Sequence, residues 1–192
     1  MRNLKEIFKR EDTGPIIRRF FINTLFDSTF MLLGIVVGAA FAADANIGVI
    51  MVTMVTSSLA LGISTGVSVY EAESLEQERK ISELERALFR DLGGTRIEES
   101  SRAIIILAAL INFLTPLLSC GVMISPYIFA ALKVINIELG SWLSIILSLS
   151  ILFSAGIYLG KLGKMNPWMK GLRMVGFGLV AFIVGLLLDT LI

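Results

Sequence analysis

Residues 47–92 read IGVIMVTMVTSSLALGISTGVSVYEAESLEQERKISELERALFRDL, a stretch that begins apolar and ends strongly charged. The apolar part, 47–70, exceeds the ~20 residues that a helix needs to cross a bilayer. No proline or glycine separates it from the charged part, which is rich in good helix formers. The stretch therefore predicts one continuous helix that crosses a membrane and then continues into water.

The composition places the whole chain in the membrane class. Hydrophobic residues make up 55% of the 192 residues, and the mean hydropathy is +0.81. Only 17% of the residues are charged, whereas ordinary globular chains carry about a quarter. The net charge of +1 provides no overall field for nucleic acid. These values exclude a soluble domain and argue against a nucleic-acid partner.

The residue types that are missing restrict the chemistry. Cys120 is the only cysteine, which excludes a disulfide within the chain and CxxC metal sites. The absence of histidine removes the commonest transition-metal ligand and the usual general base. Carboxylate, carbonyl, amide and thioether groups remain, and these suit hard or borderline divalent ions.

Five segments approach or exceed the length of a transmembrane helix. They are residues 17–43, 47–70, 103–124, 139–159 and 172–188. The predicted fold class is an all-α integral membrane protein with five transmembrane helices, in which span two extends into a cytoplasmic helical hairpin.

The chain is accordingly divided into four parts. Residues 1–16 form a cytoplasmic N-terminal segment, and 17–70 form transmembrane helices one and two. Residues 71–101 form the cytoplasmic acidic hairpin, and 102–192 form transmembrane helices three to five. The basic start of the chain precedes a full-length apolar segment without a cleavage site, so we expect a retained first span and not a signal peptide. A short surface helix is expected within 1–12.

Glycine, proline and capping residues set the expected boundaries. Gly93-Gly94 should end the long helix after Leu92, and Thr95-x-x-Glu98 has the spacing of a capping box that starts the next helix. Pro116 should kink that helix and Pro126 should end it. Residues 127–137 remain unassigned.

Basic residues predict the orientation. Sixteen of the 17 lysines and arginines fall at the N-terminus, in the hairpin or within 161–173, and only Lys133 falls on the opposite side. The positive-inside rule then places the N-terminus and hairpin in the cytoplasm and the C-terminus outside.

Asp27 is a carboxylate inside the first apolar segment, where ionisable groups are rare and usually functional. At 100° per residue, Asn23, Asp27, Met31, Gly34 and Gly38 share one sector of the helix. The two glycines have the spacing that allows close helix approach, which predicts a dimer seam. The alternative is that Asp27 reaches the interface or bonds a neighbouring helix.

The acidic residues of the long helix form two sets. Glu76 and Glu83 have basic residues at i±3 or i+4, whereas Glu71, Glu78 and Glu85 recur every seven residues without one. The second set borders an apolar line, so we expect it to face a partner helix.

Several of these acids are candidate metal ligands. Acids seven residues apart lie ~10.5 Å apart, so a shared ion would need a second helix, Glu98, Glu99 or another subunit. Glu73 and Glu76, at i and i+3, could share an ion directly. The alternative is a solvated face that ends in salt bridges.

Three stretches together resemble the vacuolar iron transporter family. They are FDSTFMLLGIVVGAAFA in span one, SSLALGISTGVSVYEAESLEQERK in span two, and KGLRMVGFGLVAFIVG near the end. The resemblance implies five spans, a homodimer, and exchange of divalent iron or manganese for protons. Asp27 matches the family's span-one aspartate, with Ser28 in place of the following glycine. Leu61-Gly62 replaces the family's Met-Gly, so Met54 or Met31 would supply the thioether.

The sequence thus predicts a transporter of divalent metal cations, iron or manganese, with proton-coupled export from the cytoplasm. The metal is the substrate, and no organic cofactor is expected. The expected partners are membrane lipid, divalent cations, protons and a second copy of the chain. The alternative is a non-transporting membrane protein whose acidic hairpin binds a partner. An enzyme is not expected, because no clustered catalytic set is present. The predicted metal-binding residues are Asp27, Asn23, Met31, Glu71, Glu73, Glu76, Glu78, Glu85, Glu98 and Glu99.

Overall fold

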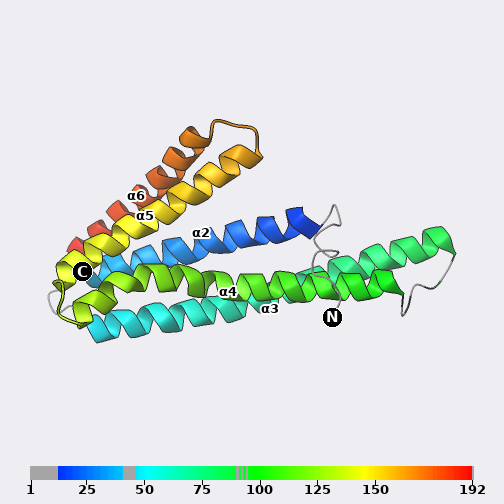
Figure 1. Cartoon of the computed structure of the whole chain (residues 1–192), viewed down its shortest axis with the longest axis horizontal. Helices are drawn as coiled ribbons and strands as arrows, with labels where there is room; N and C mark the ends of the chain where they lie inside the picture. Colours follow the sequence, from blue (N-terminus) through cyan, green and yellow to red (C-terminus); the bar gives the residue numbers. More distant parts are fainter. Residues whose placement is uncertain (1–12, 41–45, 90, 92, 94, 192) are drawn as a thin grey trace. The chain divides into compact units, whose positions relative to one another are not determined.

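A computed structural model describes residues 13–40, 46–89, 91, 93 and 95–191. These residues form five helices and no strand (Figure 1). Each helix is long and apolar enough to cross a membrane, which agrees with the predicted all-α class. The surface helix expected within 1–12 lies outside the described residues. The helices are α2 (Thr13–Ala40), α3 (Ile47–Leu88), α4 (Arg96–Ala131), α5 (Ile137–Leu162) and α6 (Pro167–Leu191).

α3 is the continuous helix that the sequence predicts, with 42 residues. Its first turn is capped by Asn46, whose Oδ1 accepts hydrogen bonds from the backbone N–H groups of Gly48 (2.9 Å) and Val49 (3.3 Å). The expected end at Leu92 is wrong, because α3 ends at Leu88. Phe89 adopts a left-handed backbone with φ of 50°, and a residue in that conformation commonly terminates a helix.

α4 contains both prolines, so the expectation that Pro126 ends the helix is wrong. A helical proline frees the carbonyl four residues earlier, and in a membrane that carbonyl needs another partner. For Pro116 this is the Asn112 carbonyl, which accepts a hydrogen bond from Thr65 Oγ1 at 3.2 Å. For Pro126 it is the Val122 carbonyl.

A serine next to Pro126 supplies the missing donor. Ser125 Oγ donates to the Val122 carbonyl at 2.7 Å, and Ser144 Oγ of α5 donates to the adjacent Met123 carbonyl at 2.8 Å. These hydroxyl groups satisfy the exposed backbone oxygens, so the helix continues to Ala131. Residues 127–131 of the segment left unassigned by the sequence are therefore helical.

The chain forms two compact units, and each is described by itself. The first comprises the residues up to Thr24 together with Leu61–Thr115. In it, α3 and α4 run antiparallel and approach closely at two glycines. A Cβ on Gly62 would lie 2.6 Å from the Phe113 carbonyl, and one on Gly66 would lie 3.4 Å from the Ala109 carbonyl. Small residues at such positions let helix backbones pack together.

The second unit comprises Leu25–Ala60 and Pro116–Ile192 and contains the main apolar core. In it, α5 and α6 lie side by side as a hairpin (Figure 1). A Cβ on Gly156 would lie 2.7 Å from Gly171 Cα, so glycine is required at this contact. The buried core residues are Leu32, Leu33, Val36, Val37, Ile50, Met54, Cys120, Met123, Ile124, Tyr127 and Ile145.

Candidate functional site

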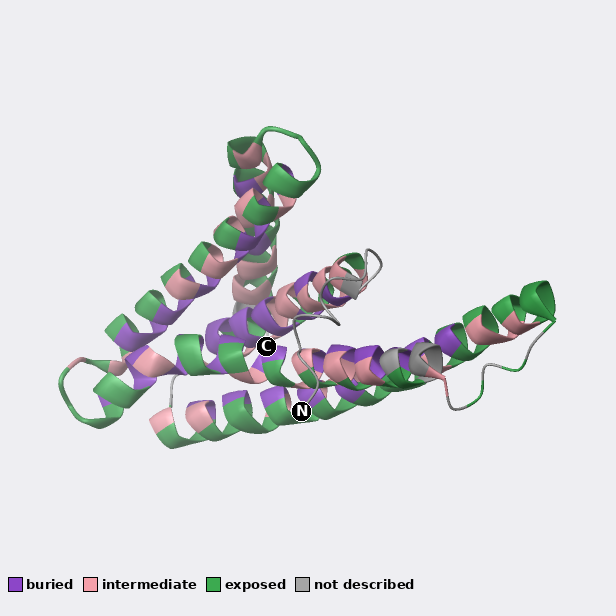
Figure 2. Cartoon of the chain, turned by 45° about the vertical axis from the view of Figure 1, so that its right-hand side comes forward, coloured by how far each residue is buried: buried purple, intermediate pink, exposed green. Residues whose placement is uncertain are grey.

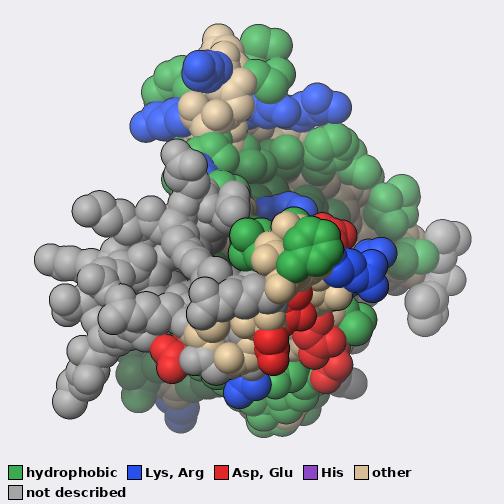
Figure 3. Space-filling model, turned by 90° about the vertical axis from the view of Figure 1, so that its right-hand side faces the viewer, with side chains coloured by type: hydrophobic (Ala, Val, Ile, Leu, Met, Phe, Trp, Pro, Cys, Tyr) green, Lys and Arg blue, Asp and Glu red, His purple; other side chains and the backbone are tan. Residues whose placement is uncertain are grey.

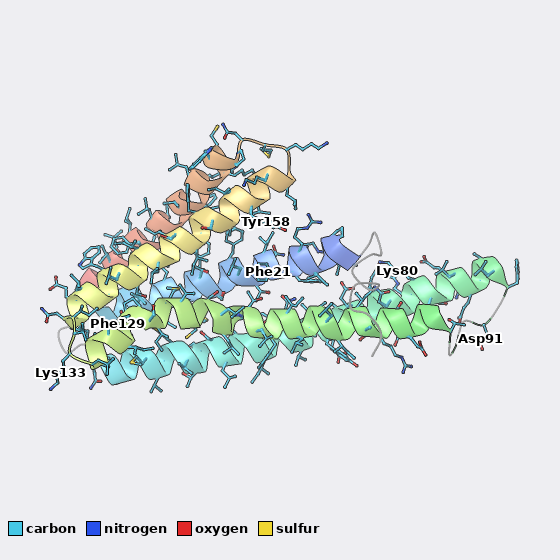
Figure 4. The ribbon with its side chains drawn as sticks, in the orientation of Figure 1. Phe21, Lys80, Asp91, Phe129, Lys133 and Tyr158 are labelled. Carbon is cyan, nitrogen blue, oxygen red and sulfur yellow. The ribbon has the colours of Figure 1, made fainter. Side chains whose placement is uncertain are left out.

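The charged end of α3, Glu71–Leu88, is called the acidic extension below. Most of its residues are exposed (Figure 2), and acidic side chains gather there in the view onto the end of α3 (Figure 3). Glu76 forms an exposed i,i+4 ion pair with Lys80, with an N–O distance of 3.5 Å (Lys80 is labelled in Figure 4). Exposed pairs of this kind contribute little to stability. This pair confirms the predicted solvated pairing of Glu76.

Glu73 differs from every other glutamate described in the extension. Its side chain is only 4% exposed, and its Oε2 atom has no hydrogen-bond partner in the described part of the chain. One turn further along α3, Gln77 is 8% exposed. An ionised carboxylate buried without a partner is strongly unfavourable, and a bound cation removes that penalty.

The position of Glu73 follows from the stripe of α3 that packs inward. Gly62, Gly66 and Val69 are buried, and steps of four residues from Val69 reach Glu73 and then Gln77. This stripe was the sequence signal for both residues, because its spacing, extended into the charged half of α3, predicts that Glu73 and Gln77 are buried. Of the heptad set, Glu71 and Glu78 are exposed and Glu85 is half-buried, so the expectation that this set faces a partner helix stays a prediction.

The predicted carboxylates are not gathered into one metal centre within the described residues. Glu73 is buried, whereas Glu76 is exposed and paired with Lys80. Glu85 is half-buried, Glu99 is exposed, and each takes part in a further interaction. The side chain of Glu98 lies outside the described set. No group of three acidic or cysteine side chains converges there, so the metal site of the hairpin stays a prediction.

Asp27 lies near the middle of the apolar part of α2 and is exposed. It makes no ion pair or hydrogen bond with the described residues. Asn23 is also exposed, and a Cβ added to Gly34 or Gly38 would have nothing within 4 Å. Met31 is half-buried and packs against the apolar core. The described residues of a single chain therefore leave this face of α2 uncovered, with Met31 at its edge.

The sequence reasoning missed a buried polar cluster in the first unit. Thr24 Oγ1 donates a hydrogen bond to Asn112 Oδ1, and Asn112 Nδ2 donates to the Ala108 carbonyl at 2.8 Å. Thr65 contacts the Asn112 carbonyl, as described above. Asn112 thus links α2, α3 and α4 by hydrogen bonds, which stabilise helix association in an apolar medium. The sequence signal for Asn112 was its position four residues before Pro116, because that proline leaves the Asn112 carbonyl without its helical hydrogen bond.

The fold and these residues indicate the class: an all-α protein with five helices long and apolar enough to span a membrane, and with acidic groups both within and beyond its apolar segments.

The comparisons with known proteins indicate no activity for this chain. No protein-family model matches the chain. The chain is 28% identical over 195 residues to an uncharacterized protein of Methanocaldococcus jannaschii, and the match covers 98% of this chain and 96% of that protein. The resemblance to vacuolar iron transporters therefore stays a prediction.

Proposed function

We propose that this protein carries divalent metal cations, iron or manganese, across a membrane and exchanges them for protons, with export from the cytoplasm. One observation carries the proposal: Asp27 lies in the middle of an apolar helix without an ion pair among the described residues. A carboxylate at that depth is rare and is usually part of an ion or proton pathway. A carboxylate that releases its proton when a cation arrives, and recovers it when the cation leaves, couples the two fluxes.

The acidic extension supports the same function. Its glutamates raise the local concentration of cations at one end of α3. Glu73 offers a buried carboxylate oxygen without a hydrogen-bond partner, which favours a cation there. Hard oxygen ligands suit manganese and ferrous iron, and Met31 would add one thioether near Asp27. The test is uptake of manganese into liposomes that contain the intact protein, with the internal pH recorded at the same time.

The uncovered face of α2 favours a homodimer. Gly34 and Gly38 are exposed and leave space above their Cα atoms, as a closely packed seam requires. A second copy would cover this face. We expect the double variant Gly34→Leu/Gly38→Leu to be monomeric where the wild type is dimeric, because leucine prevents close backbone approach. Light scattering in detergent and cross-linking in lipid measure this. The control is Gly176→Leu, at an open glycine of α6. An unchanged dimer in the double variant would place the seam elsewhere.

The orientation is proposed from the distribution of basic residues. Sixteen of the 17 lie in segments expected on one side, which the positive-inside rule places in the cytoplasm. In a Cys120→Ser background, a cysteine at Gly94 should react with a membrane-impermeant thiol reagent only from the cytoplasmic side. A cysteine at Thr190 should react only from the opposite side. Reaction of both cysteines from one side would contradict five spans.

A second function is favoured by one specific observation. The acidic extension and its end expose several large apolar side chains, and Phe89 is 97% exposed. Exposed apolar groups within a charged surface are typical of protein-docking sites. Such a protein would bind a cytoplasmic partner and move no ions. Manganese uptake in liposomes separates the two functions, because only a transporter accumulates the metal. The other exposed apolar residues are Leu75, Leu84 and Leu88.

A further inference from the structure

A groove in the first unit lies between the acidic extension and the start of α4. Its volume is about 450 Å³, within the range of small-ligand sites. The transport and docking functions proposed above assign no ligand to this groove. It is lined by Tyr70, Ser74, Gln77, Glu78, Ile81, Ser101, Arg102, Ile105 and Ile106.

Two buried polar side chains line this groove. Gln77 is 8% exposed and Ser101 is 4% exposed. An amide group and a hydroxyl group can each donate and accept hydrogen bonds. The lining of the groove therefore suits a ligand with a polar part.

The charges of the groove restrict that ligand. Arg102 and Glu78 place one positive and one negative group in the same cavity. Arg102 takes part in a further interaction, but a guanidinium group has five N–H donors and binds phosphate in a bidentate manner, so one interaction does not use all of its donors. A carboxylate accepts hydrogen bonds from a primary ammonium group. The pair complements a zwitterion better than a simple anion or cation.

The groove lies where both of its helices change from charged to apolar. Tyr70 is the last residue of the apolar half of α3 and Glu71 is the first acid, while Arg102 directly precedes the apolar run of α4. Head groups occupy this level of a membrane, and tyrosine is enriched there. Ile106 is 61% exposed and lies on the apolar side of Arg102. The ligand would therefore have a polar part in the groove and an apolar part beside it.

We propose that this groove binds the head group of a membrane phospholipid that carries both a phosphate and a primary amine. Arg102 binds the phosphate and Glu78 binds the amine. Gln77 and Ser101 complete the hydrogen bonds, and the lipid chains start over Ile106. This inference depends on membrane insertion of α3 and α4 and not on metal transport.

The test measures which lipids the intact protein retains. The full chain is purified in detergent, incubated with equal amounts of phosphatidylethanolamine and phosphatidylglycerol, and studied by native mass spectrometry. The wild type should retain the ethanolamine lipid in preference. Arg102→Gln and Glu78→Gln should each reduce that retention by about tenfold, because each removes a charge-assisted hydrogen bond. The matched controls are Arg79→Gln and Glu83→Gln, which change exposed residues of α3 that do not line the groove.

A third variant separates loss of binding from loss of folding. Ser74→Phe fills the groove without changing its charge, and it should lose the ethanolamine lipid while its melting temperature stays at the wild-type value. Equal retention in all three groove variants would overturn the proposal. A preference for phosphatidylglycerol that Glu78→Gln strengthens would also overturn it, in favour of an anionic lipid. Displacement of the lipid by chain-free glycerophosphoethanolamine or by an amino acid at equal concentration would show a soluble ligand instead.

Discussion

Asp27→Asn should reduce manganese uptake into liposomes to the level of protein-free vesicles and should abolish the accompanying proton flux. Asparagine keeps the shape of the side chain and one neutral oxygen ligand, but it cannot exchange a proton for a cation. The measurement is metal accumulation together with internal pH, under an imposed pH gradient. The variant should remain folded and dimeric, because Asp27 makes no ion pair or hydrogen bond with the described residues.

The matched control for this variant is Asp91→Asn. Asp91 is an exposed aspartate outside the helices, and its Oδ1 accepts a hydrogen bond from the Gly93 N–H group at 2.8 Å. Uptake by this control should equal that of the wild type. If Asp27→Asn transports manganese and protons at the wild-type rate, Asp27 has a structural role and the exchanger proposal must be abandoned.

The position of Asp27 in an apolar helix also links the transport proposal to the dimer proposal. An aspartate at the centre of a membrane helix opposes insertion by about 2.5–3.5 kcal/mol. Within one described chain no basic side chain offsets that cost. A dimer seam along the same face of α2, or a cation at the carboxylate, would offset it. The transport and dimer proposals therefore concern the same uncovered face.

Hydropathy and local signals predicted the helices well because these features depend on nearby residues. The apolar and charged halves of α3 belong to one helix, as the lack of a breaker at Tyr70 and Glu71 indicated. Thr95 directly precedes the first residue of α4, and the Thr95 carbonyl accepts a hydrogen bond from the Glu99 N–H group at 3.2 Å. These interactions span four residues or fewer, so the sequence contains the information directly.

The errors came from local interactions of side chains as well as from contacts between distant segments. Pro126 was expected to end the helix, but the carbonyl that it frees accepts a hydrogen bond from Ser125, and the Ser144 hydroxyl of α5 donates to the neighbouring Met123 carbonyl. Similarly, the sequence pattern does not distinguish Glu73 from Glu76. In the structure Glu73 is buried, whereas Glu76 is exposed and forms an ion pair with Lys80. Burial depends on which stripe of α3 packs inward, and the acids alone do not reveal that stripe.

Replacing the buried carboxylate should make the metal-free protein more stable. We expect Glu73→Leu to raise the free energy of unfolding without metal by about 1–3 kcal/mol, because it removes a buried polar atom that has no partner. In the wild type, manganese at a hundredfold excess over its dissociation constant should contribute about 2.7 kcal/mol by mass action. Glu73→Leu should lose most of that metal-dependent stabilisation. Thermal unfolding with and without manganese measures both effects.

The control for Glu73→Leu makes the same substitution at Glu83, which is exposed on the same helix and outside the predicted metal-binding set. Glu83→Leu should leave both the metal-free stability and the response to manganese near the wild-type values. The two readouts of Glu73→Leu separate two roles. A variant that is less stable without metal would show that the Glu73 carboxylate is satisfied within the fold. A variant that keeps the full response to manganese would remove Glu73 from the proposed metal site, because the cation would then be bound by other oxygens.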